Sequence, residues 1–156
     1  MAWSASKIFM ALFEDVLENT TAMDLNSDTF KAALFDNDIT PDQTVTSANT
    51  AFGAGQWVSA GNEVFDAAEW ATGGVALASV TSTRASNVYT FDAADTASGS
   101  SATLAAVFGC LVYDDTIAAP VADQGVSYHY FGGTQSVTDG VFTVIWNSAG
   151  IFSITA

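Results

Sequence analysis

The chain has 156 residues, a length that fits one domain over residues 1–156; 49% of its residues are apolar, 13% are charged, and the net charge is -14. Lys7, Lys31 and Arg84 are its only Lys and Arg residues, against 17 acidic ones. So few cations cannot neutralise a run of phosphates, which argues against binding to nucleic acid or to anionic membrane surfaces.

The N-terminal segment predicts one helix over about residues 4–19. Ser4 or Ser6 can cap it by accepting a bond from a free backbone N–H. The apolar run before Glu14 is too short for a signal sequence or a membrane span. The helix serves either as a lid over the edge of a β-domain or as an arm that docks on a partner. Its apolar stripe consists of Phe9, Leu12, Phe13, Val16 and Leu17.

From Asp28 onward the sequence predicts a β-rich fold. Short runs of β-branched and aromatic residues alternate with clusters of Gly, Asn, Asp and Ser, which is typical of strands and turns. We expect a mostly β, antiparallel sandwich or barrel of about seven to nine strands. The predicted strands are Thr29–Phe35, Val75–Thr81, Ser86–Phe91, Thr103–Tyr113, Gly125–Phe131, Val141–Trp146 and Ile151–Thr155, with Glu63–Phe65 as a further candidate.

Two of these strands are apolar on both faces, whereas an antiparallel sheet with one wet face alternates apolar and polar residues. We expect the first to be a central strand or one covered by another subunit, and the two-sided apolar pattern of both strands predicts a homo-oligomer. Phe108 and Phe142 should be buried. The opposed faces are Leu104, Phe108 and Val112 against Val107, Leu111 and Tyr113 in the first strand, and Phe142, Val144 and Trp146 against Val141 and Ile145 in the second.

Several segments carry turn signals. The connection Asp36–Gly61 is long and irregular, and such connections are usually functional or poorly ordered. Thr96–Ser101 predicts a turn of small residues. The pairs Gly73-Gly74 and Gly132-Gly133 lack the spacing of a phosphate-binding loop, so we interpret them as turns or bulges.

Residues able to carry chemistry are sparse. His129, the one histidine, lies between Tyr128 and Tyr130, and Cys110, the one cysteine, lies in an apolar run. A serine triad, a Cys–His pair or a histidine-rich zinc site would require His129, and Cys110 could meet it only through tertiary folding. Asp36-Asn37-Asp38 and Asp114-Asp115 supply oxygen ligands of the type that Ca²⁺ prefers, but Asx turns explain them equally well. We expect no enzymatic activity and no cofactor or metal.

Three stretches together resemble a family of small proteins encoded among the head and tail genes of tailed bacteriophages. Members of that family carry an "FKVAL" strand, an aromatic-T-A-G-G turn, a "G-x-L-V-Y" strand and a "DFGG-x-Q-S-V-x-x-G-x-F-T-V" hairpin. This chain departs from the pattern at Tyr130, where an aspartate is usual, and its aromatic turn begins with Trp70. The stretches are Thr29–Phe35, then Trp70–Leu77 with Tyr89–Thr96, and Phe131–Val144 with Gly150–Phe152.

The resemblance implies a non-catalytic virion structural protein. We expect a capsid decoration protein, assembled in the host cytoplasm, that binds the major capsid protein and copies of itself on the capsid surface. A tail or head–tail component is the alternative, and a carbohydrate- or receptor-binding module with exposed Trp57, Trp70, Tyr128 and Tyr130 is a further one. The candidate partner-interface residues are Lys7, Phe9, Phe13, Trp57 and Trp70.

Overall fold

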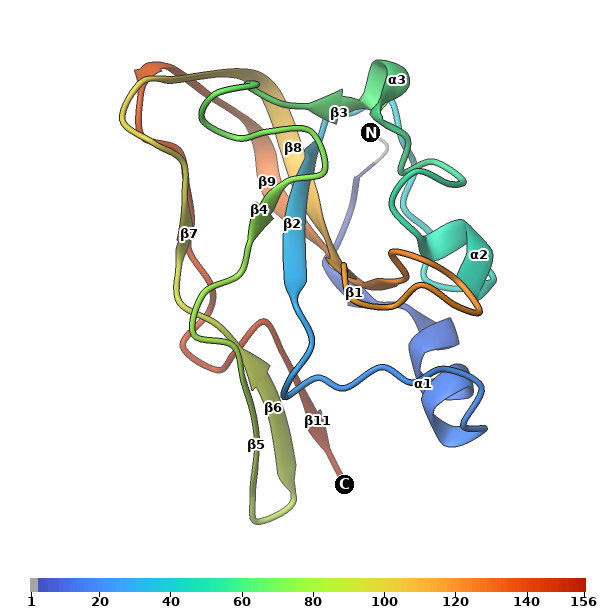
Figure 1. The fold of residues 1–156 in the computed structure, drawn as a ribbon. Coiled ribbons are helices and arrows are strands. Elements are labelled where there is room, and N and C mark those ends of the chain that lie inside the picture. The colour runs from blue at the N-terminus through green and yellow to red at the C-terminus, as the bar shows by residue number, and fades with distance from the viewer. Residues whose placement is uncertain (1–2) are drawn as a thin grey trace.

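A six-stranded antiparallel sheet is the centre of the structure, which is a computed structural model with residues 3–156 described. Its strand order is β1-β9-β8-β2-β3, and β4 also pairs with β2 (Figure 1). We call it the main sheet. Its strands are β1 (Lys7–Ile8), β2 (Phe30–Phe35), β3 (Glu63–Val64), β4 (Val75–Ala76), β8 (Ala102–Asp114) and β9 (Gly125–Gly140).

Two smaller antiparallel sheets complete the fold. One pairs β10 (Thr143–Val144) with β7 (Thr96–Ala97), and the other has the order β11-β6-β5. The β7–β10 pair continues the long β8–β9 ribbon, which turns over and returns beside the main sheet (Figure 1). The result is a β-sandwich rather than a closed barrel. The strands of the three-stranded sheet are β5 (Thr81–Ala85), β6 (Val88–Asp92) and β11 (Phe152–Thr155).

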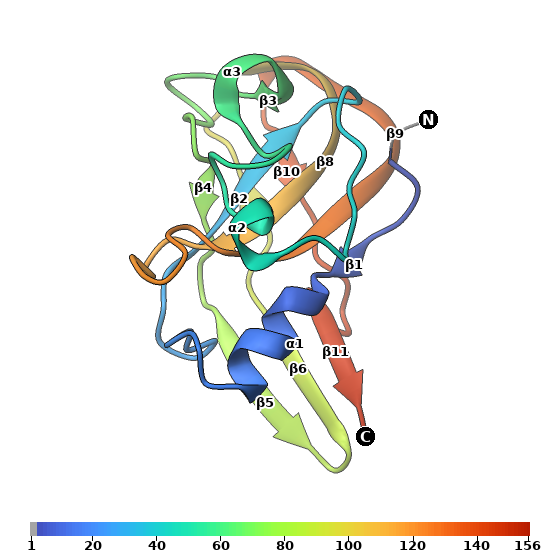
Figure 2. The ribbon, with the colours of Figure 1, turned by 90° about the vertical axis from the view of Figure 1, so that its right-hand side faces the viewer.

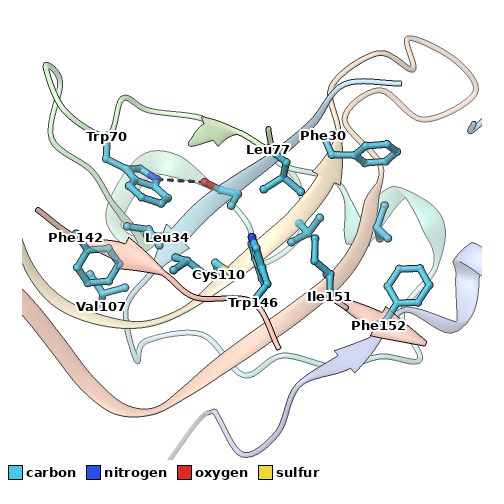
Figure 3. Packing of buried hydrophobic residues seen from close by; sticks show 14 of the residues in the cluster. Phe30, Leu34, Trp70, Leu77, Val107, Cys110, Phe142, Trp146, Ile151 and Phe152 are labelled. Carbon is cyan, nitrogen blue, oxygen red and sulfur yellow. Dashed lines mark hydrogen bonds between the residues drawn. The ribbon is translucent and has the colours of Figure 1, made fainter. Parts of the chain in front are cut away.

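The larger core lies between the main sheet and the two smaller sheets. Trp70 joins the layers there, because its indole N–H donates to the Ala32 carbonyl at 3.2 Å and its ring meets Phe142 edge-on (Figure 3). Phe142 is buried, as predicted. The main sheet contributes Phe30, Ala32, Leu34, Leu104, Val107, Cys110 and Val112, and the opposite layer Phe91, Phe142, Val144, Trp146, Ile151 and Phe152.

A second core covers the other face of the main sheet. The N-terminal segment and the connection Asp36–Gly61 supply its cover, with the short helix α2 (Ser47–Thr50) in front of β2 and β8 (Figure 2). Trp57 packs edge-on against Phe35 with ring centroids 5.1 Å apart. The cluster consists of Trp3, Phe9, Ala33, Phe35, Ile39, Trp57, Leu111, Tyr113 and Tyr128.

This second core decides between the two interpretations of the two-sided strand β8, which is a central strand of the main sheet. Both of its faces are covered by the chain itself, so its apolar pattern is no evidence for a second subunit. The long connection acts as a lid over the sheet and is not a peripheral loop. It ends in a turn, α3 (Ser59–Asn62), where Gly61 has a φ of 98° and lies outside the helical region.

The predicted facing of β8 was wrong around Phe108. Register shifts on both sides of Val107, with a φ of 57° at Ala106, break the alternation of side chains. Val107 therefore shares the larger core with Leu104 and Val112. Phe108 packs against the second core and is only half-buried, not buried as predicted.

The predicted helix over residues 4–19 is shorter in the structure, where α1 spans Met10–Leu17. Neither Ser4 nor Ser6 caps it, because the N-cap position is Phe9, which makes no side-chain cap. Residues 7 and 8 form β1 instead, and the Ser6 hydroxyl accepts a bond from Tyr130 N–H at 3.1 Å. Pairing with β9 thus overrides the helical spacing of the first residues.

Other boundaries also differ. The predicted strand Val75–Thr81 breaks after Ala76, and a left-handed Ser86 makes the β5–β6 turn, so that β6 begins at Val88. The predicted strand Gly125–Phe131 extends to Gly140 and is bulged at Gly132-Gly133. Val107 pairs with Gln135, and Gly109 pairs with Tyr130. Between these two pairs β9 has four residues, 131–134, whereas β8 has only Phe108.

Candidate docking groove

Cys110 and His129 are neighbours in the structure, because they face each other in the β8–β9 register. Burial raises the pKa of the Cys110 thiol and lowers the pKa of His129 to about 4, so both are neutral at pH 7. The His129 ring packs edge-on against Trp146, and its Nε2 lies 2.9 Å from the Ser127 hydroxyl. A reactive thiolate–imidazolium pair is disfavoured here. The two residues serve the packing of the larger core.

Three of the five sequence-predicted interface residues are in the cores. Phe9, Trp57 and Trp70 are at most 2% exposed, so they cannot contact a partner while the chain is folded. That prediction was wrong, because their apolar stripe and turn positions point inward. Lys7 is exposed and Phe13 is half-buried, so both remain accessible.

The aromatic residues considered for carbohydrate binding do not form an exposed platform. Trp57, Trp70 and Tyr128 are buried, and Tyr130 is half-buried. Trp57 and Tyr128 pack against each other within the second core, with ring centroids 6.0 Å apart. The structure therefore provides no stacking surface from these four residues.

A different surface stands out, a groove along the side of the molecule. On one wall lie β9, β1 and α1, and on the other lie β10, β11 and the segment between them. It consists of four adjoining hollows of about 420, 180, 330 and 320 Å³. Neighbouring hollows share side chains. The first and second hollows share Phe131 and Val144, the second and third share His129 and Ile151, and the third and fourth share Phe13 and Phe152. We call this surface the docking groove.

Most of the exposed large apolar side chains gather in the docking groove. Leu17 is 83% exposed and Ile145 is 75% exposed, and both line it. Met10, Val16 and Ile154 line it as well, whereas Val141 and Phe65 do not. Five of the seven exposed large apolar side chains among residues 3–156 thus share one surface.

The local structure explains why these side chains are exposed. In α1, Leu12 is buried, while Val16 and Leu17, one turn later, are exposed and line one hollow together with Ile154 of β11. In the segment around β10, strand alternation turns Phe142, Val144 and Trp146 inward and leaves Val141 and Ile145 in water, as their predicted facing requires. At both places part of the predicted apolar face is therefore left uncovered by residues 3–156.

The charged side chains of the protein lie almost entirely outside the docking groove. None of the 17 acidic side chains lines it, and Lys7 is the one charged residue among the lining residues. Glu14, Asp15 and Glu18 lie on or just after α1, outside the groove. An acidic surface thus borders a nearly uncharged groove, which is most apolar where α1 meets β11.

The backbone beside the groove is partly unpaired. β10 pairs with β7 on one edge, and no strand of the described chain pairs with its other edge. β11 is likewise an edge strand of its sheet. Edge strands of this kind can accept an added strand from another chain.

Comparisons with known protein families, curated proteins and solved structures found no match to this chain. Within residues 3–156, no helix has the length and apolar character needed to cross a membrane.

Proposed function

We propose that this protein is a non-catalytic structural component that docks onto a larger assembly through the docking groove. The supporting observation is the gathering of five of the seven exposed large apolar side chains on that one surface. Contiguous exposed apolar surface usually marks an interface. The cores, in contrast, are complete within one chain.

The occupant that fits the groove is an apolar segment flanked by Lys or Arg in a partner protein. The groove itself is nearly uncharged, while this chain carries a net charge of -14 and acidic residues flank α1. A basic partner is attracted, whereas a second copy of equal charge is repelled. Charge complementarity therefore favours a different protein over self-association.

The sequence resemblance to phage head and tail proteins gives this partner a context. We propose a capsid decoration protein that attaches to the lattice of the major capsid protein, with the acidic surface directed away from packaged DNA. Repulsion between the acidic surface and phosphate is consistent with this orientation. A tail or head–tail component would use the same groove on a different partner.

The test uses tailed-phage particles assembled without this protein, to which purified protein is added. The groove variant is Leu17→Ser with Ile145→Ser, and the matched control is Phe65→Ser, which removes an exposed apolar side chain outside the groove. We expect the groove variant to bind at least tenfold more weakly and the control to bind like the wild type. Circular dichroism melting checks that all three proteins are folded.

Two further readouts complete the test. Binding should survive a wash at about 1 M salt, where the Debye length is roughly 3 Å, because apolar burial is screened far less than exposed charge pairs. Unchanged binding of the groove variant would overturn the proposal. A dimer of the free protein, seen by sedimentation and lost in the groove variant, would assign the groove to a second copy instead.

A further inference from the structure

Asp114 is a buried carboxylate with one unsatisfied oxygen. It lies at the end of β8 and is 0% exposed. Its Oδ1 accepts the backbone N–H groups of Thr116 at 2.8 Å and Ile117 at 3.2 Å, which is the Asx turn that the sequence predicted. Its Oδ2 is buried without a hydrogen-bond partner. Leaving a buried charged oxygen unpaired is costly, so it needs a partner.

The side chain that faces Asp114 comes from another part of the sequence. The β2–β8 register pairs Phe30 with Asp114, which brings Asp28 to the same end of the strand pair. Thr29 fixes this position, because its N–H donates to the Thr116 hydroxyl and its carbonyl accepts from Asp115 N–H, each at 2.8 Å. Burial, with a contribution from the Asp28 carboxylate, raises the pKa of Asp114 to about 6.

Asp28 lies directly beside Asp114. Its Oδ2 accepts the Asp24 N–H at 2.6 Å, and its carboxyl group is within hydrogen-bond range of the Asp114 carboxyl group. Lys31 does not neutralise the pair, because its ammonium group is bound to Asp115 at 2.9 Å. Two carboxylate oxygens thus approach each other with no cation between them.

The loop that holds Asp28 repeats oxygen-bearing side chains at alternate positions, Asp24, Asn26 and Asp28. This is the spacing of the first half of an EF-hand loop, although Thr29 stands where that loop has glycine. Asp24 Oδ1 accepts the Asn26 N–H at 2.9 Å and shapes the turn. The loop thus carries further hard oxygen ligands close to Asp28 in the sequence.

We propose that Asp28 and Asp114 together bind a divalent cation, with Ca²⁺ as the best fit. The cation would give Asp114 Oδ2 its missing partner and would remove the repulsion between the two carboxylates. In the described part of the chain no three His, Cys, Asp or Glu side chains converge. Water would therefore complete the coordination, and we expect weak binding, with a dissociation constant on the order of 10⁻⁴–10⁻³ M.

The experiment is thermal melting at pH 7.5 in metal-free buffer, with CaCl₂ raised to about 10 mM and NaCl added to keep the ionic strength constant. Because a ligand of the folded state stabilises it by mass action, we expect the melting temperature to rise by a few degrees, on the order of 4 °C. The rise should be lost in Asp28→Asn and in Asp114→Asn. Asp114→Asn keeps the Oδ1 acceptor for its two backbone donors, so it should fold.

Asp139→Asn is the matched control, because Asp139 is an exposed acid on β9 and belongs to neither of the acidic clusters. It should keep the full Ca²⁺ response, and calorimetric titration should show one site in the wild type and in this control. The proposal is overturned if Ca²⁺ shifts the wild type no more than NaCl does. An equal shift in Asp28→Asn and the wild type would overturn it as well. Neither result depends on the docking groove.

Discussion

The indole ring of Trp3 lies directly over Gly109 in the middle of β8. A Cβ at Gly109 would come 2.6 Å from Trp3 Cζ3 and 2.3 Å from the His129 carbonyl oxygen. The absence of a side chain at this one position lets the N-terminal segment lie flat on the sheet. Gly109 therefore decides whether the second core can close.

Gly109→Ala should destabilise the protein by about 1–3 kcal/mol, because the added methyl group overpacks against Trp3 and the β9 backbone. Gly140→Ala is the control, since its Cβ would meet no backbone atom closer than 3.8 Å and its nearest neighbour is the Val137 Cγ2 methyl at 3.0 Å. Urea unfolding followed by tryptophan fluorescence measures both. Equal stability of Gly109→Ala and the wild type would show that Trp3 does not pack there.

Phe142 and Phe108 should differ in their contribution to stability. Phe142 is buried and contacts Trp70 and Phe131, whereas Phe108 is half-buried beside the second core. Phe142→Ala should cost about 3–5 kcal/mol, through lost transfer energy and the cavity that remains. Phe108→Ala should cost clearly less. Chemical denaturation of the two variants gives this order, and the reverse order would contradict the facing of β8.

Leu12 and Leu17 provide a test of α1. Leu12 is buried, and Leu12→Ala should cost about 2–5 kcal/mol. Leu17 is 83% exposed in the docking groove, so Leu17→Ala should change stability by no more than about 0.5 kcal/mol. Thermal melts of both variants separate the part of α1 that holds the fold from the part left free for docking. A large loss in Leu17→Ala would mean that this end of α1 is packed.

His129 and Asp114 should give pH dependences of opposite sign. The pKa of His129 falls from 6.5 to about 4 on folding, so the unfolded chain binds its proton first and stability is lost as the pH falls from 6.5 to 4. The pKa of Asp114 rises from 3.8 to about 6, so the folded chain binds its proton first and stability is gained as the pH falls from 6 to 4.

The measurement is the unfolding free energy in EDTA from pH 7 to pH 4 for the wild type, His129→Gln and Asp114→Asn. Relative to the wild type, His129→Gln should become more stable on acidification, and Asp114→Asn should become less stable. Both variants should diverge from the wild type mainly between pH 6.5 and 4. Parallel curves for all three proteins would show that neither group titrates as its burial requires.

The regular β-strands could be predicted from the sequence. Thr29–Phe35, Glu63–Phe65 and Ile151–Thr155 lie between clear turn signals, and the structure places β2, β3 and β11 there within a residue or two. The mostly β, antiparallel class follows from the same pattern. The start of α1 was not predictable, because Lys7 and Ile8 are extended only through pairing with Tyr128 and Ser127 of β9.

The sites were harder to predict, because apolar faces do not reveal what covers them. The strand of Leu111 could be central or covered by another subunit, and the strand of Ile145 suggested assembly. In the structure the connection Asp36–Gly61 helps to cover Leu111, whereas no part of residues 3–156 covers Ile145. Similarly, Asp114 was recognisable as part of an acidic turn at the end of β8. Asp28, which lies beside it, precedes β2 and is far away in the sequence. The alternate spacing of Asp24, Asn26 and Asp28 was the one signal in the sequence that pointed to that loop.

The pairing of β1 with β9 also has a consequence for how the chain folds. Trp3 and Phe9 belong to a core whose other walls include Tyr128, so the earliest part of the chain is buried against one of the latest. Contacts between such distant segments form slowly, because a long loop must close before any of them is gained. Until β9 is in place, the N-terminal aromatic residues stay in water, and the nascent chain depends on its acidic residues to avoid aggregation.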